Sequence, residues 1–143
     1  MKNKSTTEHR FEKVEIINGT RFINDSKSTN FHSVSSASER VKNALLIMHG
    51  ITKNIPTSEL QLSNEIKKII IPKDMNLDHN LFHCEVEVIK SIFELEDILK
   101  KDFQRFETVL FSCGGSSFND FENYIERGKF FKSIVKNLKG GQN

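Results

Sequence analysis

The apolar residues of this chain fall into short runs whose spacing changes from strand-like to helix-like and back. Residues 14–16 and 20–23 alternate as half-buried strands should, and Asn18-Gly19 between them is the dipeptide favoured in two-residue hairpin turns. Four further runs predict strands: residues 44–48, 69–71, 84–88 and 108–111. The first two runs are continuously apolar, which is typical of strands buried on both faces of a parallel sheet.

Helical spacing separates these strands. One helix is expected over about residues 31–42, two more begin at the capping boxes of Ser58 and Ser91, and a last helical pattern runs over residues 118–138. Gly128 is expected to divide that last helix, because glycine costs about 1 kcal/mol inside a helix. Strands that alternate with helices after an opening hairpin predict an α/β fold. We expect a three-layer Rossmann-like sandwich with a mostly parallel sheet, in which the N-terminal β-hairpin provides an antiparallel strand.

Length and composition narrow the class of protein. The 143 residues suit one domain, expected over residues 8–140 after a loose, disordered tail at residues 1–7. A formal charge of +2 with scattered basic residues argues against nucleic acid as a partner. No apolar run approaches ~20 residues, so no membrane insertion is expected. Cys84 and Cys113 lie far apart without metal-ligand spacing and no signal peptide is evident, which predicts reduced thiols in a cytoplasmic protein.

Three polar loops follow predicted strands and carry the candidate chemistry: residues 24–30, 49–53 and 112–117. Because the carboxyl ends of parallel strands meet at one edge of a sheet, ligand groups are expected there, with Lys27 and Lys53 holding anions. Hydroxyl groups and the N–H groups that open the last helix are available as hydrogen-bond donors. This set suits a dicarboxylate or a phosphorylated ligand. The alternative interpretation of residues 24–30 is a turn that only caps the following helix.

Several catalytic patterns are missing from the sequence. Ser112 and Ser117 lack the Gly-x-Ser-x-Gly elbow, and the five histidines lack metal spacing, so no metal site is predicted. His49 and Cys113 are interpreted as a structural histidine and a spectator thiol. The phosphate-binding pattern Gly-x-x-x-x-Gly-Lys-Ser/Thr is absent, although an ATP-using enzyme acting alone would need such an element. The residues by themselves indicate the ligand-binding part of a larger unit.

The polar motifs resemble those of a known family. His9-Arg10-Phe11-Glu12, the run Ile-Asn-Asp-Ser-Lys-Ser-Thr-Asn at 23–30, and Gly50-Ile51-Thr52-Lys53 are similar to successive motifs of the C-terminal domain of the Mur ligases. The segments at 109–112, 116–121 and 126–131 resemble the branch of that family that adds D-glutamate. The resemblance covers residues 8–138, and its Asn-Asp-Ser-Lys-x-Thr-Asn motif is highly specific.

The resemblance implies an ATP-dependent, ADP-forming ligase of peptidoglycan synthesis in the cytoplasm. Such an enzyme adds D-glutamate to UDP-N-acetylmuramoyl-L-alanine: ATP phosphorylates the carboxylate of the UDP-linked substrate, and the D-glutamate amine attacks the acyl phosphate. In the family a first domain binds the UDP-sugar, and a central domain carries the phosphate loop and most Mg²⁺ ligands. The C-terminal domain contacts D-glutamate and closes over ATP. This chain would therefore pack against its own central domain and would be inactive alone.

Matched to the family's motifs, individual residues acquire expected roles. Arg10 and Asp25 are expected at the nucleotide, with Asp25 at the ribose. Lys27, the expected catalytic residue, falls near the transferred phosphate and the reacting carboxylate. Tyr124 stands where the family usually has phenylalanine. The expected D-glutamate positions are Thr29, Lys53, Ser117 and Tyr124.

The chain departs from the family pattern in three places. His49-Gly50 replaces a usual Gly-Gly, Ser112-Cys113-Gly114 replaces Ser-Pro-Ala, and Asn119 replaces a frequent aspartate. These changes concern fine geometry more than substrate identity. Two alternatives remain from the sequence: a stand-alone ligand-binding or regulatory remnant, and a sister Mur ligase that adds a different amino acid. The chain is interpreted as an excised domain rather than a naturally truncated relative.

Overall fold

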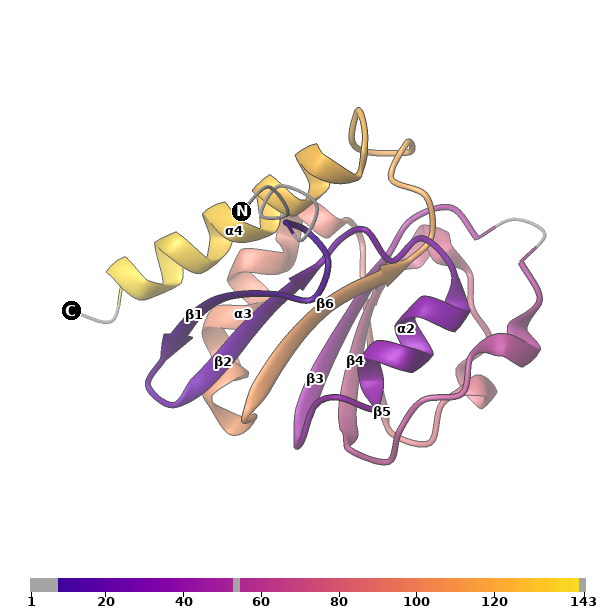
Figure 1. The fold of residues 1–143 in the computed structure, drawn as a ribbon, viewed down its shortest axis with the longest axis horizontal. Coiled ribbons are helices and arrows are strands. Elements are labelled where there is room, and N and C mark those ends of the chain that lie inside the picture. The colour runs from indigo at the N-terminus through magenta and orange to yellow at the C-terminus, as the bar shows by residue number, and fades with distance from the viewer. Residues whose placement is uncertain (1–7, 53–54, 142–143) are drawn as a thin grey trace, which may run out of the picture.

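The computed structural model describes residues 8–52 and 55–141 of the chain. The tail expected at residues 1–7 lies outside the described residues, and so does Lys53. The described part forms one six-stranded sheet with helices on both faces (Figure 1). The predicted α/β sandwich is therefore confirmed.

The sheet is parallel apart from the N-terminal hairpin. Its strands are β1 (Glu12–Ile17), β2 (Thr20–Asp25), β3 (Ala44–His49), β4 (Ile66–Pro72), β5 (Glu85–Ile89) and β6 (Thr108–Gly114). Their order in the sheet is β1-β2-β6-β3-β4-β5; β1 pairs with β2 in antiparallel fashion, and the other neighbours are parallel. Asn18 and Gly19 turn the hairpin with φ angles of 50° and 88°, which confirms the predicted turn.

Helices cover the two faces of the sheet unequally. The α-helix α2 lies on one face, whereas α3 and α4 lie on the other (Figure 1). The helices are α2 (Phe31–Ser38), α3 (Leu95–Asp102) and α4 (Tyr124–Gly140), and the short 3₁₀ helices are η1 (Thr57–Glu59), η2 (Lys73–Met75), η3 (His79–Leu81), η4 (Ile92–Glu94) and η5 (Phe103–Arg105).

Successive side chains of the central strands point to opposite faces of the sheet and contribute to two hydrophobic cores. Leu45 and Ile47 of β3 point into the core shared with α3 and α4, and Leu46 and Met48 point into the core under α2. All four side chains are fully buried, and burying one of this size stabilises a fold by about 1.5–3 kcal/mol relative to exposing it. Both faces of the sheet therefore need a cover, as the continuous apolar run predicted.

The helix predicted from Ser58 is wrong. Only the turn η1 forms, and the chain then continues through an irregular stretch and a turn at residues 64–65 into β4, which begins at Ile66. Serines of α2 accept backbone N–H groups of this stretch. Ser35 Oγ accepts the Gln61 N–H at 2.9 Å, and Ser38 Oγ accepts the Ser63 N–H at 3.0 Å. Hydrogen bonds from a distant helix thus replace those that a local helix would have made.

The helix predicted over residues 31–42 is shorter than expected, because α2 ends at Ser38. The helix predicted from Ser91 is confirmed, although its first turn is the 3₁₀ helix η4. Ser91 Oγ caps that turn by accepting the Phe93 N–H at 3.1 Å.

The break predicted at Gly128 is also wrong. Helix α4 is continuous through this residue, and it begins at Tyr124 rather than Phe118. The ring of His9 packs against α4 here: a Cβ on Gly128 would lie 2.0 Å from His9 Nδ1. The glycine serves close packing instead of ending a helix.

Candidate functional site

The loops expected to carry chemistry open at one edge of the sheet. Strands β2, β6 and β3 are parallel neighbours, with Asp25 in register with Ser112 and His49 in register with Gly114. The loops that follow these strands therefore lie side by side. The predicted shared edge is confirmed for the described residues, and Lys53 lies outside them.

Asp25 ends β2 with a carboxylate that is engaged on both oxygens. Its Oδ1 accepts the Phe11 N–H at 2.8 Å, and its Oδ2 accepts the hydroxyls of Ser28 and Ser112. Burial raises the pKa of this carboxyl, while the three hydrogen bonds and the charge of Arg10 oppose the rise. A carboxylate oxygen has two lone pairs, so in the described part of the chain Oδ1 keeps one acceptor position.

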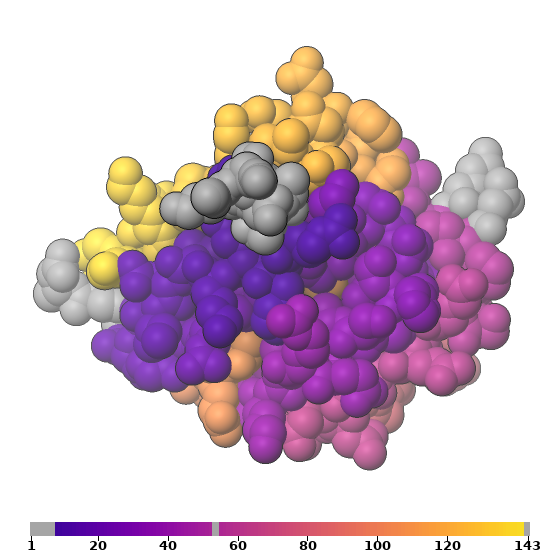
Figure 2. Space-filling view, viewed as in Figure 1, coloured from indigo at the N-terminus to yellow at the C-terminus, as the bar shows by residue number. Residues whose placement is uncertain are grey.

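Asp25 lines an open pocket of about 230 Å³ beside α2. Arg10, Lys27 and Arg40 also line it, and among the described residues none of these cations has a carboxylate at salt-bridge distance. The Arg40 guanidinium stacks on Phe11, 3.7 Å from the ring centroid. Figure 2 shows this face, where the indigo N-terminal residues adjoin the purple residues around α2. The pocket suits an anion that also carries hydroxyl groups.

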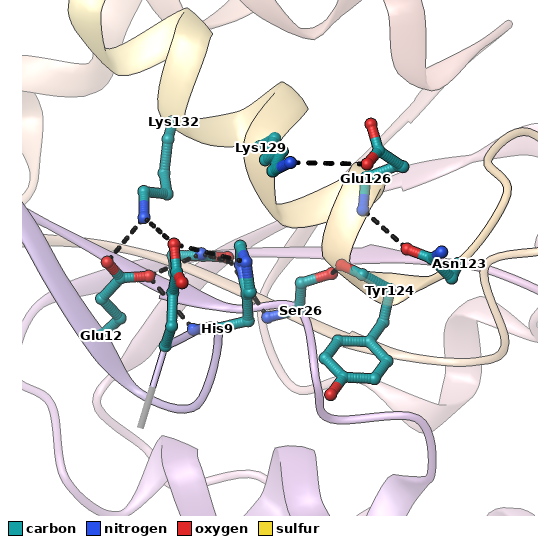
Figure 3. Close-up of polar contacts among 10 residues, drawn as sticks. His9, Glu12, Ser26, Asn123, Tyr124, Glu126, Lys129 and Lys132 are labelled. Atoms are coloured by element: carbon teal, nitrogen blue, oxygen red, sulfur yellow. Dashed lines mark hydrogen bonds and ion pairs between the residues drawn. The ribbon is translucent and has the colours of Figure 1, made fainter. Parts of the chain in front are cut away.

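Lys27 is held by Tyr124, the first residue of α4. The Nζ atom lies 3.3 Å from Tyr124 Oη and 4.4 Å from the centroid of its ring. Ser26 Oγ donates to the Tyr124 carbonyl at 2.7 Å, so the loop after β2 is attached to the start of α4 (Figure 3). The structure thus makes neighbours of the expected catalytic lysine and one expected D-glutamate residue.

A polar network holds the N-terminal segment against α4 and the end of β2 (Figure 3). Lys132 Nζ lies 2.7 Å from Glu12 Oε2, and the Asn24 amide donates to Glu12 Oε1 at 3.0 Å and to His9 Nδ1 at 2.8 Å. His9 is buried, and burial lowers the pKa of its ring. The His9 carbonyl accepts the Lys27 N–H at 2.9 Å, so this network also fixes the backbone on both sides of the pocket.

The loops after β3 and β6 touch through their backbones. The Ile51 N–H donates to the Ser116 carbonyl at 2.9 Å, and the Ser116 N–H donates to the Ile51 carbonyl at 3.0 Å. Gly50 allows this approach, because it has a φ of 125° and a Cβ there would lie 2.4 Å from the Ser116 oxygen. The segment that leads to Lys53 is thereby joined to the segment that leads to Ser117.

Arg127 of α4 is fully buried and connects the C-terminal ends of strands β2, β3 and β6. Its Nε and Nη2 donate to Ser26 Oγ and O at 3.0 and 2.8 Å, and its Nη1 donates to the Gly115 and His49 carbonyls at 2.9 and 3.2 Å. Its partners are neutral groups in segments far apart along the chain. Arg127 stands in the closing motif of the sequence without a predicted role, since a lone arginine beside a glycine is a weak signal.

His49 extends this cluster towards Asp120. The Nδ1 atom lies 3.1 Å from Arg127 Nη1, and Nε2 lies 2.8 Å from Asp120 Oδ2. A guanidinium only donates, so Nδ1 accepts and the ring proton sits on Nε2, which donates to Asp120. Burial lowers the pKa of His49; Arg127 lowers it further, while Asp120 and Asp74 oppose. The ring is therefore neutral and held as one tautomer.

The departures from the Mur pattern meet in this cluster. His49 is the register partner of Gly114, and Asn119 Nδ2 lies 3.3 Å from both Asp120 Oδ2 and Asp74 Oδ2. An amide donates to two carboxylates that an aspartate at this position would repel. The three unusual positions thus belong to one connected arrangement.

The other expected residues lie apart from the pocket. Thr29 is exposed just before Asn30, which caps α2, and Ser117 is buried in the loop before α4. Neither lines the Asp25 pocket. Cys113 is fully buried, and burial raises the pKa of its thiol to about 12, which makes it a poor nucleophile.

Metal-binding and membrane features were sought in the same part of the chain. Residues 8–52 and 55–141 contain no group of three or more His, Cys, Asp or Glu side chains able to hold a metal ion. No helix among those residues is both long enough and apolar enough to cross a membrane.

Comparison with known proteins gives one consistent result. The chain is 39% identical over 144 residues to the UDP-N-acetylmuramoylalanine–D-glutamate ligase of Thermosipho africanus, which covers 94% of this chain and 33% of the relative. The ligase of the same name from Thermosipho melanesiensis is 36% identical, over 93% of this chain and 32% of that relative. The one from Christiangramia forsetii is also 36% identical, over 92% of this chain and 31% of that relative. The chain spans about one third of the length of these curated relatives. No family model matches it.

Proposed function

We propose that this chain, a homologue of the D-glutamate-adding Mur ligases over a segment consistent with their C-terminal domain, contributes D-glutamate contacts and closes over ATP in such a ligase. The observation that carries the proposal is 39% identity across 94% of the chain to a ligase of that name. The shared edge of the three loops supports it, because the loops that carry Asp25, Lys27 and Ser117 lie on one side of the sheet.

The nucleotide side is proposed at the pocket of Arg10, Asp25 and Lys27. The remaining acceptor position on Asp25 Oδ1 suits a ribose hydroxyl. The cations of the pocket have no carboxylate at salt-bridge distance among the described residues, so they suit phosphate oxygens. A pocket of about 230 Å³ on an open face fits only part of a nucleotide, which agrees with a ligand shared with a second domain. Bound ATP would supply the phosphoryl group that activates the carboxylate of UDP-N-acetylmuramoyl-L-alanine, with release of ADP.

Lys27 is proposed to act through its charge. Its Nζ is held beside Tyr124 rather than against a carboxylate, so its positive charge remains available to phosphate or carboxylate oxygens. Tyr124 restricts where that charge lies and borders the D-glutamate side of the same edge. Loss of Lys27 should therefore lower kcat more than it raises KM.

The D-glutamate side is proposed at Thr29, Lys53, Ser117 and Tyr124. The assignment comes from the motif resemblance, and the backbone bridge between Ile51 and Ser116 supports it by joining the segments before Lys53 and Ser117. A dicarboxylate needs charge-assisted donors to offset its desolvation. Lys53 is the proposed cation for this purpose.

The rest of the reaction is proposed to lie on other domains of the whole ligase. The UDP-sugar site, the phosphate loop and most Mg²⁺ ligands are expected there, with this chain packed against the central domain. The 143-residue chain by itself should neither hydrolyse ATP nor form the amide bond. ATP turnover by the purified chain that disappears in Asp25→Ala would contradict this division of labour.

A chimeric ligase tests the proposal. The chain would replace the matching third of the Thermosipho africanus ligase, and phosphate release would be followed at varied D-glutamate and ATP. We expect D-glutamate-dependent turnover. Loss of a contact worth ~1.5–3 kcal/mol in Lys53→Ala should raise the D-glutamate KM roughly 10- to 150-fold and leave the ATP KM nearly unchanged.

Control variants assign the outcome. Lys27→Ala should mainly depress kcat, and the exposed Lys67→Ala should change nothing. A chimera that folds and binds ATP but turns over only with another amino acid would favour a sister ligase. A folded chimera without any turnover would favour a binding or regulatory remnant.

A further inference from the structure

We propose that His49 is a positioning residue for the amino-acid site: it fixes the spacing between the loop after β3 and the loop after β6 by bonding to Arg127 on one side and Asp120 on the other. The identity of the ligand rests on the proposed function, because these are the two loops assigned to D-glutamate. The positioning itself rests only on the geometry of the described residues.

The hydrogen bonds around His49 run in one direction. Arg127 Nη1 donates to Nδ1 at 3.1 Å, and Nε2 donates to Asp120 Oδ2 at 2.8 Å. The imidazole is completely buried, whereas the Asp120 side chain is 25% exposed. The ring therefore joins a buried cation to a carboxylate at the surface. The bond from Arg127 requires a bare Nδ1, the bond to Asp120 requires a proton on Nε2, and both conditions are met by the same tautomer.

The same ring spans the two loops. His49 is the last residue of β3, and Asp120 lies in the segment between β6 and α4. The same two segments also exchange backbone hydrogen bonds through Ile51 and Ser116, at 2.9 and 3.0 Å. Arg127 also donates to the Gly115 carbonyl at 2.9 Å, so the loop after β6 is held at Gly115, Ser116 and Asp120. Opening the His49–Asp120 bond should loosen that loop, while the Arg127 and Ile51–Ser116 bonds remain to hold it.

The charged groups that face His49 come from three elements. Arg127 belongs to α4, Asp120 to the loop before it, and Asp74 to η2. Asn119 joins the last two, with its Nδ2 at 3.3 Å from each carboxylate. A proton added to Nδ1 would place an N–H against the Arg127 N–H, so this arrangement admits only the neutral ring. Burial lowers the pKa of His49 in the same sense.

Two measurements on the 143-residue chain test the proposal without any ligand. The ¹⁵N chemical shifts of the His49 ring should show protonated Nε2 and bare Nδ1, and this pattern should persist as the pH falls below the ordinary histidine pKa of 6.5. Amide hydrogen exchange should accelerate about 10- to 150-fold at Ile51 and Ser116 in His49→Ala and Asp120→Ala. The buried β4 amides of Ile69 and Ile70 serve as the internal reference.

Matched variants separate positioning from general stability. His49→Gln keeps an acceptor for Arg127 and a donor for Asp120, so it should retain slow exchange at Ile51 and Ser116. The exposed His79→Ala should have no effect. If His49→Ala does not fold, Asp120→Ala and His49→Gln decide the matter. A proton on Nδ1, unchanged exchange in Asp120→Ala, or equal acceleration of the β4 amides would overturn the inference.

The chimeric ligase then connects the positioning to the ligand. Asp120→Ala should raise the D-glutamate KM more than it lowers kcat, and His49→Gln should restore the parent value. If the chimera shows no dependence on D-glutamate while the exchange results hold, the proposed function fails and the positioning stands. If D-glutamate is used and Asp120→Ala leaves its KM unchanged, the positioning inference fails and the proposed function stands.

Discussion

Two clusters of polar side chains lie at the same edge of the sheet, and they differ in whether their positive charges are buried among protein groups or line an open pocket. Around Arg127 the guanidinium is fully buried, and its donors meet carbonyls, a hydroxyl and a neutral imidazole. Around Lys27 the cations Arg10 and Arg40 line an open pocket. Among the described residues no carboxylate lies at salt-bridge distance from them, and the charge of Arg10 acts on the Asp25 carboxyl only from farther away. One cluster uses its charge within the protein, and the other presents its charge to solvent.

This difference separates structural charges from ligand-binding ones. A buried charge must be surrounded by partners, because an uncompensated one costs several kcal/mol. A charge that must bind an anion has to lie where the anion can reach it and must not already be neutralised. The cluster around Arg127 is therefore expected to determine stability, and the cluster around Lys27 is expected to determine ligand binding.

The largest expected effect is loss of the buried guanidinium. Arg127→Met should reduce the free energy of unfolding by about 3–5 kcal/mol, because carbonyls at the ends of three strands and His49 Nδ1 lose their donor. Urea denaturation followed by circular dichroism measures the change. Lys129→Met, on the exposed side of the same helix, is the control and should leave the midpoint nearly unchanged. An Arg127→Met midpoint equal to that of the parent would remove the basis of the comparison.

The next effect concerns the packing of His9 under α4. Gly128→Ala should destabilise the chain by about 1–3 kcal/mol, because the new Cβ would lie 2.0 Å from His9 Nδ1. Gly140→Ala adds a methyl group to the same helix with nothing within 4 Å, so it should stabilise by up to ~1 kcal/mol. Thermal or urea unfolding of the two variants should therefore shift in opposite directions. A stabilising Gly128→Ala would show that the His9 ring moves aside freely.

A pH dependence of stability should arise from the two buried histidines. Burial lowers the pKa values of His9 and His49, so below about pH 6.5 the unfolded chain binds more protons than the folded chain. The free energy of unfolding should fall as the pH drops from 6.5 towards 5, by at most about 1.4 kcal/mol per pH unit for each histidine. Asp25 acts in the opposite sense, because burial raises its pKa.

Histidine variants assign that dependence to the two buried rings, His9 and His49. His49→Gln should flatten the fall in stability measured by urea denaturation at several pH values, and so should His9→Gln. His32→Gln, which alters a residue lining the open pocket, is the control and should leave the slope as it is. A slope that survives the loss of both buried rings would assign the effect to other groups.

The smallest effects on stability are expected in the open cluster. Lys27→Ala and Arg40→Ala should leave the unfolding midpoint nearly unchanged, because neither side chain has an ion-pair partner in the described part of the chain. Both should weaken nucleotide binding in the chimeric ligase, as measured by calorimetry with ADP. If either variant instead unfolds the chain while nucleotide affinity is kept, the open cluster is structural and the contrast with Arg127 disappears.

Local sequence signals were sufficient wherever the structure depends on neighbours along the chain. Asn18-Gly19 turns the hairpin through its own backbone preferences, and the apolar run from Ala44 to Met48 is buried on both faces because successive side chains point to opposite faces. The α/β class and the shared edge of the loops follow from such signals. The polar motifs around Asp25 and Lys27 likewise pointed to the edge where the pocket lies.

Tertiary contacts decided what depends on distant residues. The capping box at Ser58 yielded no helix, because Ser35 and Ser38 accept its backbone N–H groups instead. The sequence predicted a helix break at Gly128, but the glycine instead makes room for the ring of His9, which lies near the other end of the chain.

The roles of Arg127 and His49 were likewise hidden in the sequence, since their partners come together only when the loops after β2, β3 and β6 meet. A sequence pattern records which groups are present and how a segment folds by itself. Which buried donor meets which acceptor is determined by the packing of segments that the pattern treats as independent.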